Sequence, residues 1–156
     1  MSTKATPTDA ELILKLYDLR RESEIRKARD WWLVKFWPES AEDVMKIANA
    51  LGTQENNWLR QAGGYWEMAA SMVVHGAINR DLFLEPASSG EMFFFFAKFR
   101  PFLKELREKL NSPTMMANIE KLVMSTEETR QRLQGIEQRI AARKAAMKEA
   151  AVARAS

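Results

Sequence analysis

The chain has 156 residues, of which 46% are hydrophobic and 29% are charged, and it contains no cysteine. The hydrophobic content suffices for a folded core, which excludes a wholly disordered chain. The lack of cysteine excludes thiolate nucleophiles, iron–sulfur clusters and cysteine-based zinc sites. The formal net charge is +3, and it lies in the C-terminal part: seven basic and four acidic residues occur from Thr126 onward, and 17 of each kind precede them.

The N-terminus lacks the apolar stretch of a secretory signal. The most apolar windows, residues 68–74 and 92–96, are too short to span a bilayer. We therefore expect a cytoplasmic protein without a membrane span.

The first helix is expected over residues 7–37, with Thr6 as its N-cap, Pro7 at the first helical position and Pro38 beyond its end. The apolar stripe changes position around residues 20–24. We expect a bend or a break there, with the charged side chains forming a solvated face.

The next two helices are expected from Ser40 to about residue 51, and from Thr53 or Asn56 to Gly76. The third helix contains Gly63 and Gly64, and each costs about 1 kcal/mol relative to alanine. Either a close contact between helices or a local kink would account for this pair.

A short connecting helix is expected over residues 78–84, followed by a loop at 85–89. A fifth helix should run from Gly90 to about residue 110, because Ser88 and Glu91 have capping-box spacing. Pro101 is expected to kink it.

The last region begins at Ser112 and Pro113 and is either one helix or two. Its apolar residues fall on one heptad register: Ile119, Leu122, Leu133, Ile136, Ile140 and Met147. Beyond Arg139 the composition is mostly alanine, lysine, arginine and glutamate, which favours helix without requiring burial. The sequence predicts an all-α fold: a compact bundle of about five to six helices over residues 7–124, then a long, basic, coiled-coil-like C-terminal helix over 125–156.

Residues that commonly carry catalysis are scarce. His75 is the only histidine, and it is either a general base or a cation placed near a helix C-terminus. With one histidine and no cysteine, the usual catalytic triads cannot be assembled, and neither paired Glu-x-x-His motifs nor a phosphate-binding glycine loop occurs. We expect no enzymatic activity, catalytic residue, cofactor or metal.

Three features allow a binding role: the tryptophans, a run of phenylalanines and the C-terminal helix. Five tryptophans within 36 positions (Trp31, Trp32, Trp37, Trp58 and Trp66) form either core or an aromatic ligand pocket. Four consecutive phenylalanines, Phe93, Phe94, Phe95 and Phe96, cover the whole circumference of a helix. They must be enclosed by the chain or form a contact with a second chain.

The C-terminal helix also has two interpretations. Its heptad residues Leu133, Ile136 and Ile140 would pack on another helix of the same chain or of a second one. Its basic residues Arg139, Arg143, Lys144 and Lys148 would instead contact nucleic acid or another anionic surface. We favour a non-enzymatic protein-interaction or self-assembling module, a homo-oligomer or the partner of another helical protein, in which residues 93–96 and the heptad residues make the contacts. A nucleic-acid or anionic-surface accessory protein is the alternative.

Several short segments resemble a family of uncharacterised bacterial helical proteins, known as a domain of unknown function. They are Tyr65-Trp66-Glu67-Met68-Ala69, Gly76-Ala77-Ile78-Asn79-Arg80-Asp81-Leu82, Phe99-Arg100-Pro101-Phe102 and Glu105-Leu106-Arg107, with Leu19-Arg20-Arg21 as a further part. The resemblance implies an all-α fold and a bacterial source, and it brings no catalytic residues. Some members of that family add a transmembrane segment, for which this sequence shows no candidate.

Overall fold

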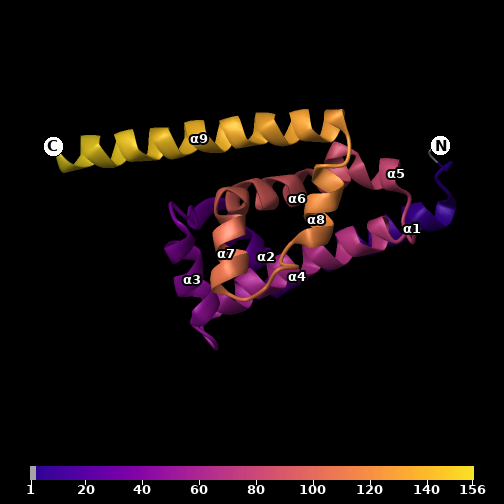
Figure 1. Ribbon diagram of the computed structural model, residues 1–156, viewed down its shortest axis with the longest axis horizontal. Helices are drawn as coiled ribbons and strands as arrows, with labels where there is room; N and C mark the ends of the chain where they lie inside the picture. The colour runs from indigo at the N-terminus through magenta and orange to yellow at the C-terminus, as the bar shows by residue number, and fades with distance from the viewer. Residues whose placement is uncertain (1–2) are drawn as a thin grey trace.

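The computed structural model describes residues 3–156, and all regular structure within that range is helical (Figure 1). This part of the chain forms nine α-helices, one π-helical segment and one 3₁₀ turn. In order they are α1 (Pro7–Leu19), α2 (Ser23–Asp30), η1 (Trp31–Lys35, π), α3 (Ala41–Asn49), α4 (Gln54–Val74), α5 (Arg80–Leu84), α6 (Pro86–Phe99), η2 (Arg100–Phe102, 3₁₀), α7 (Leu103–Lys109), α8 (Ala117–Val123) and α9 (Glu127–Ala155).

The all-α prediction is confirmed, and so is the long C-terminal helix. The expected number of five to six helices is wrong, because the chain interrupts two of the longer expected helices, 7–37 and 90–110.

The first interruption follows α1, at the expected position. Thr6 and Asp9 form a capping box at the start of α1, which ends at Leu19. The carboxylate of Glu22 then accepts hydrogen bonds from the backbone N–H groups of Glu24 and Ile25 and begins α2. After Asp30 the helix widens into η1, where the N–H of Phe36 donates to the carbonyl of Trp31 over 2.8 Å.

The second interruption comes at Pro101, within the 3₁₀ turn η2 that separates α6 from α7. The start of this region differs from the prediction. Helix α6 begins at Pro86, and most of the expected loop at 85–89 is its first turn. Proline fits the first helical position because no intrahelical bond is needed from that nitrogen. Ser88 therefore lies within the first turn and does not cap the helix, and the neighbouring Ser89 is buried with its hydroxyl donating to the carbonyl of Leu84.

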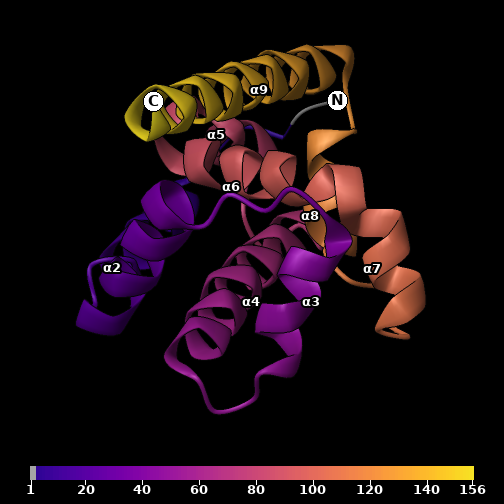
Figure 2. The same cartoon turned by 90° about the vertical axis from the view of Figure 1, so that its left-hand side faces the viewer.

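Helix α4 is the centre of the lower layer, and α2, α3 and α8 pack against it. Helix α6 lies between this layer and α9, which crosses the outside of the bundle (Figures 1 and 2). The core therefore extends from α4 through α6 to the first half of α9.

The two glycines within α4 are not required by a close helix contact. A Cβ added at Gly63 would meet the ring of Phe95 at 3.7 Å, an ordinary contact, and one added at Gly64 would meet nothing within 4 Å. Gly76 is different, because its φ of +78° lies in the left-handed region and ends α4 beside the C-cap residue His75.

Candidate functional site

The four phenylalanines are packed inside the chain. Phe93, Phe95 and Phe96 are at most 2% exposed, and Phe94 is half-buried. Phe95 meets Trp32 edge to face with ring centroids 5.2 Å apart. The guanidinium of Arg132 on α9 covers the ring of Phe93, with its carbon 4.0 Å from the centroid. Of the two alternatives for this run, the structure of the single chain shows the enclosed one for Phe93, Phe95 and Phe96, which α9 and η1 of the same chain cover.

The three heptad residues share this environment. Leu133 is fully buried, and Ile136 and Ile140 are about 5% exposed. They lie on the face of α9 that packs on α6. Of the two interpretations of the heptad, the structure shows the one in which α9 packs on a helix of its own chain. These side chains are not available to a partner.

The basic residues of α9 fall into two groups. Lys144 donates to the carbonyl of Pro38 over 2.5 Å, and Lys148 pairs with Glu39 at 3.3 Å, so both attach α9 to the segment that follows η1. Arg139 and Arg143 are exposed, and within residues 3–156 neither makes a hydrogen bond or an ion pair. The arginines are therefore the free cations of the group.

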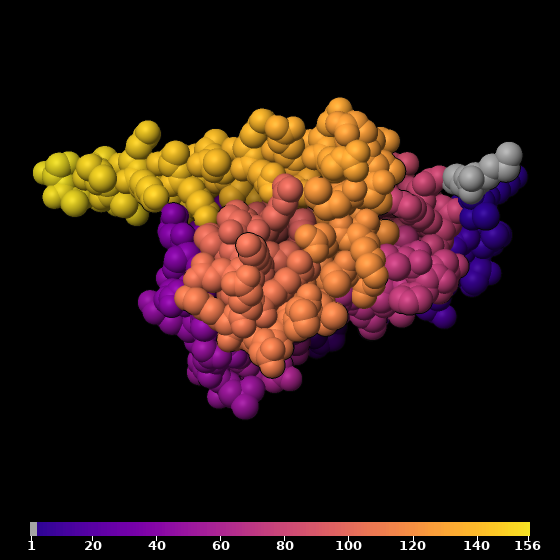
Figure 3. All heavy atoms as spheres, viewed as in Figure 1, coloured from indigo at the N-terminus to yellow at the C-terminus, as the bar shows by residue number. Residues whose placement is uncertain are grey.

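The end of α9 extends beyond the bundle (Figure 3). We call residues 127–140 the anchored segment and residues 141–155 the projecting segment. In the projecting segment only Lys144 is half-buried, and every other residue is exposed. It carries four basic residues and one acidic residue, together with the exposed apolar side chains of Met147 and Val152.

Lys98 is a feature that the sequence analysis missed. It lies on α6 and is 1% exposed. Its Nζ donates to the backbone carbonyls of Trp32 within η1 and of Phe36, the C-cap residue, and lies 3.7 Å from the ring centroid of Trp37. Burial, with a smaller contribution from the charge of Lys144, lowers the pKa of Lys98 to about 7. A lysine within a phenylalanine-rich run is the only sequence signal of this arrangement.

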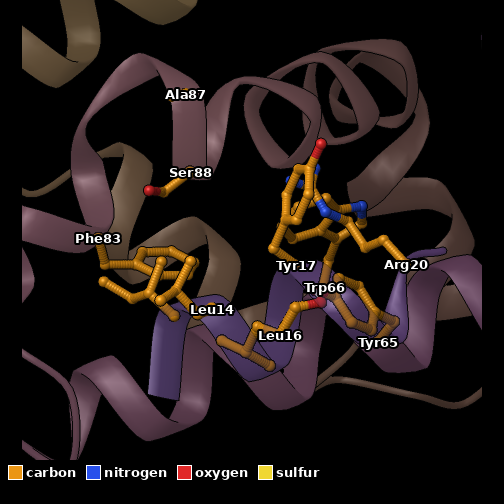
Figure 4. A pocket seen from close by; sticks show the side chains of 10 residues that line it. Leu14, Leu16, Tyr17, Arg20, Tyr65, Trp66, Phe83, Ala87 and Ser88 are labelled. Atoms are coloured by element: carbon orange, nitrogen blue, oxygen red, sulfur yellow. Dashed lines mark hydrogen bonds between the residues drawn. The ribbon is translucent and has the colours of Figure 1, made fainter. Parts of the chain in front are cut away.

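A second feature that the sequence analysis missed is a cavity between α1, α4, α5 and the start of α6 (Figure 4). Its volume is about 270 Å³, and its walls are mostly apolar side chains, among them Ile13, Leu16 and Phe83. Tyr17, Arg20 and Trp66 gather at one end of it (Figure 4). Of the five tryptophans, Trp66 is the one that lines this cavity.

The guanidinium of Arg20 closes that end of the cavity. Its carbon lies 4.9 Å from the ring centroid of Tyr17 and 5.4 Å from that of Trp66, and the residue is 7% exposed. One of its nitrogens lies 3.6 Å from Glu91, whose carboxylate also accepts two hydrogen bonds from Arg29. Two cations thus share one carboxylate.

The residues that carry the family resemblance have structural roles. The hydroxyl of Tyr65 donates to the carbonyl of Leu16 over 2.5 Å and fastens α1 to α4. The carboxylate of Glu67 accepts hydrogen bonds from the backbone N–H groups of Asn118 and Ile119 and so caps α8. Asn79 is the N-cap of α5.

His75 lies at the C-terminal end of α4, as one of the two interpretations expected. It is exposed, and its Nδ1 lies 2.8 Å from the carbonyl of Ser71. Among residues 3–156, no three histidine, aspartate or glutamate side chains are grouped closely enough to hold a metal ion. None of the helices in the same range combines the length and apolar character needed to cross a bilayer.

Comparison with curated proteins and with solved structures finds no match. Residues 5–126 match the model of a protein family described as a domain of unknown function, DUF4760. The matched part begins just before α1 and ends at Thr126, the N-cap of α9, and the resemblance seen in the sequence is confirmed. The chain belongs to the DUF4760 family.

Proposed function

We propose that the chain is a cytoplasmic, non-enzymatic protein-interaction module that binds an acidic helical partner through the projecting segment of α9. The observation that carries the proposal is that α9 continues for about 22 Å beyond Ile140, its last buried residue. Only Lys144 along this length is half-buried, so most of the surface is free to meet a partner.

The composition of the projecting segment favours a helical partner. Alanine has a high helix propensity, so the segment is helical without burial, and the small alanine side chain allows another helix to approach closely. Met147 and Val152 supply exposed apolar contacts. The segment has no aromatic residue, so it lacks the stacking groups with which proteins commonly bind single-stranded nucleic acid.

Charge decides which partner is favoured. The projecting segment has a net charge of +3, from Arg143, Lys144, Lys148 and Arg154 against Glu149. Two copies of this segment would repel each other, and an acidic surface would attract it. We therefore favour an acidic helix of another protein as the partner, and we consider a second copy of this chain the weaker candidate.

The test uses a synthetic helical peptide of roughly 20 residues, about 30 Å long, with glutamate on one face and leucine on the other. Duplex DNA and vesicles of phosphatidylcholine with phosphatidylserine are the competing probes. The peptide should bind more tightly than either, and binding should weaken with added salt. Tighter binding to DNA or to the vesicles would overturn the proposal in favour of the anionic-surface alternative, and light scattering that shows a dimer of the 18.0 kDa chain would overturn it in favour of self-assembly.

A matched pair of variants localises the contact. Arg143→Glu with Arg154→Glu reverses two charges of the projecting segment and should abolish peptide binding. Lys4→Glu with Lys121→Glu makes the same change of net charge at exposed positions elsewhere and should leave binding nearly unchanged. Equal losses in both variants would show that net charge alone drives binding, and the proposal would fail.

A further inference from the structure

The cavity beside Arg20 has the features of a small-molecule site, and no residue of α9 lines it. A cavity of 150 Å³ holds benzene, which has six carbon atoms, so one of about 270 Å³ has room for roughly ten non-hydrogen atoms. This is near the lower end of the size range of ligand pockets. The apolar lining calls for an apolar body in the ligand.

Arg20 gives the cavity a polar end. Its side chain is more than nine-tenths buried and lines the cavity, and its guanidinium packs on the rings of Tyr17 and Trp66. Among residues 3–156 its polar contact is the 3.6 Å ion pair with Glu91, which leaves the donors of the guanidinium open to a ligand. A guanidinium presents two parallel donors to a carboxylate, and hydrogen bonds between charged groups are stronger than those between neutral ones. Arg20 is therefore ready to accept an anionic group that enters the cavity.

The surrounding charges favour an anion. Within residues 3–156, Glu91 is the one carboxylate that forms an ion pair with Arg20, and Arg29 already donates two hydrogen bonds to it. A second hollow of about 390 Å³ adjoins the cavity through Tyr17, Arg20 and Ala87, and Arg21 lines it as well. Three arginines face one carboxylate in this region, which leaves a net positive charge where the ligand head would lie.

The outer rim is apolar and exposed. Leu14 is 66% exposed and Tyr17 is 53% exposed, and both lie on α1 at the edge of the cavity (Figure 4). A ligand that fills the cavity would cover part of these side chains and gain further apolar burial.

We propose that this cavity binds a small amphiphilic monocarboxylate, with its carboxylate on the guanidinium of Arg20 and an aliphatic body of about eight carbons against Ile13, Leu16 and Phe83. The site is independent of the projecting segment. Deleting residues 147–156 therefore leaves this binding unchanged, and the two proposals can fail separately.

The probe is octanoate, titrated into the full chain by calorimetry. Octan-1-ol has the same aliphatic chain without the charge, and butyrate has the charge with a shorter chain. Octanoate should bind saturably at one site and at least about ten-fold more tightly than either control, because both the charged pair and the apolar burial are needed. Equal affinity for octan-1-ol, or no saturable binding of octanoate below about 1 mM, the affinity of a weak ligand, would overturn the proposal.

Two variants test the geometry. Arg20→Met keeps an apolar stem beside Trp66 and removes the guanidinium, and it should weaken octanoate binding at least about ten-fold. Arg26→Met removes an exposed arginine that lines neither hollow, and it should weaken binding less than about three-fold, as expected for a distant solvated charge. Similar losses in the two variants would contradict a specific role of Arg20.

A third variant guards against misfolding of Arg20→Met. Ala87 is exposed at the rim, so Ala87→Phe fills the cavity from the surface and leaves the core unchanged. It should abolish octanoate binding while the thermal unfolding midpoint stays near that of the parent chain. Undiminished binding would place the ligand elsewhere and overturn the proposal. Binding of octanoate only in the presence of phosphatidylcholine vesicles would likewise assign the effect to a lipid surface.

Discussion

The two segments of α9 are continuous in the backbone, yet their composition and their surroundings differ. In the anchored segment, Leu133, Ile136 and Ile140 pack on α6, and Arg132 donates to the carbonyl of Leu84 over 2.7 Å. In the projecting segment, Lys144 and Lys148 contact the body through a hydrogen bond to Pro38 and an ion pair with Glu39, and Lys144 also lies 5.7 Å from the ring centroid of Phe102.

The comparison shows that local capping and helix propensity form this helix, whereas burial of apolar side chains determines its position. Thr126 and Thr129 cap α9 in a reciprocal pair of hydrogen bonds, and alanine-rich sequence continues the helix to Ala155 without burial. Burial of three apolar side chains determines where the helix lies. The anchored segment should therefore govern stability, and the projecting segment should govern interaction.

The largest expected effect comes from the anchored segment. Leu133→Ala removes a fully buried side chain, and it should lower the free energy of unfolding by about 2–5 kcal/mol. Val152→Ala, at a position that is 70% exposed, should change it by less than about 0.5 kcal/mol. Urea denaturation measures both, and equal effects would remove the distinction between the segments.

The next effect is a dependence of stability on pH. Folding lowers the pKa of Lys98 from 10.5 to about 7. Between pH 7 and 10 the unfolded chain therefore holds a proton on this lysine that the folded chain has lost, so the free energy of unfolding should rise with pH, by at most about 1.4 kcal/mol per pH unit. Below pH 7 both states are protonated, and this contribution is constant.

Variants at the two lysines check the cause of this rise. Lys98→Met should abolish it in urea denaturation series from pH 7 to 10. Lys144→Gln removes the second cause of the low pKa, so the rise should begin at a higher pH. Arg154→Gln removes an equal charge from the end of the projecting segment and should leave the profile unchanged. A flat profile for the parent chain would contradict the prediction.

A smaller effect concerns the ion pair between the anchored segment and η2. Both carboxylate oxygens of Glu137 accept from Arg100, at 2.8 and 3.0 Å, on a partly exposed surface. Glu137→Gln should lower the free energy of unfolding by about 0.2–1 kcal/mol at low salt and by less at high salt. Glu149→Gln in the projecting segment is the matched control, for which no measurable loss is expected. A larger loss at Glu149 would show that the distal helix is also held by the body.

The smallest effect should come from deleting residues 147–156. The deletion removes the exposed pair of Lys148 and Glu39, which contributes little. The free energy of unfolding should change by less than about 0.5 kcal/mol, while the helical circular dichroism signal falls with the number of residues removed. A large loss of stability would show that the projecting segment belongs to the folded core.

Much of the fold could be predicted because its signals are local. Thr6 with Asp9, Ser40 and Asn79 begin helices through bonds to residues three positions away, and Pro101 ends α6 where it was expected to kink it. The π-helical segment η1 was not predicted. The carbonyls of Trp32 within it and of Phe36 at its C-cap accept hydrogen bonds from Lys98, which lies more than 60 positions away in the sequence.

The candidate sites were harder to predict because they depend on contacts between residues that are distant in the sequence. The enclosure of residues 93–96 depends on how α9 and η1 lie over α6, and this is a property of the tertiary fold rather than of the run itself. The cavity is closed by Arg20, whose charged neighbour Glu91 is 71 positions away. The sequence marked residues 19–21 only through the family resemblance, with no indication that one arginine is buried.

Helix α1 forms one wall of the cavity, and a hydrogen bond near each end attaches it to the rest of the chain. Near its start, Asp9 accepts from the backbone N–H of Asn79, and near its end the hydroxyl of Tyr65 donates to Leu16. Burial raises the pKa of Tyr65 to about 12, so its hydroxyl stays protonated and remains a hydrogen-bond donor in any neutral or mildly alkaline buffer. The backbone amides of α1 should exchange with deuterated solvent when these hydrogen bonds break locally, faster than the amides of the other helices. Their exchange rate would then measure how often the cavity opens.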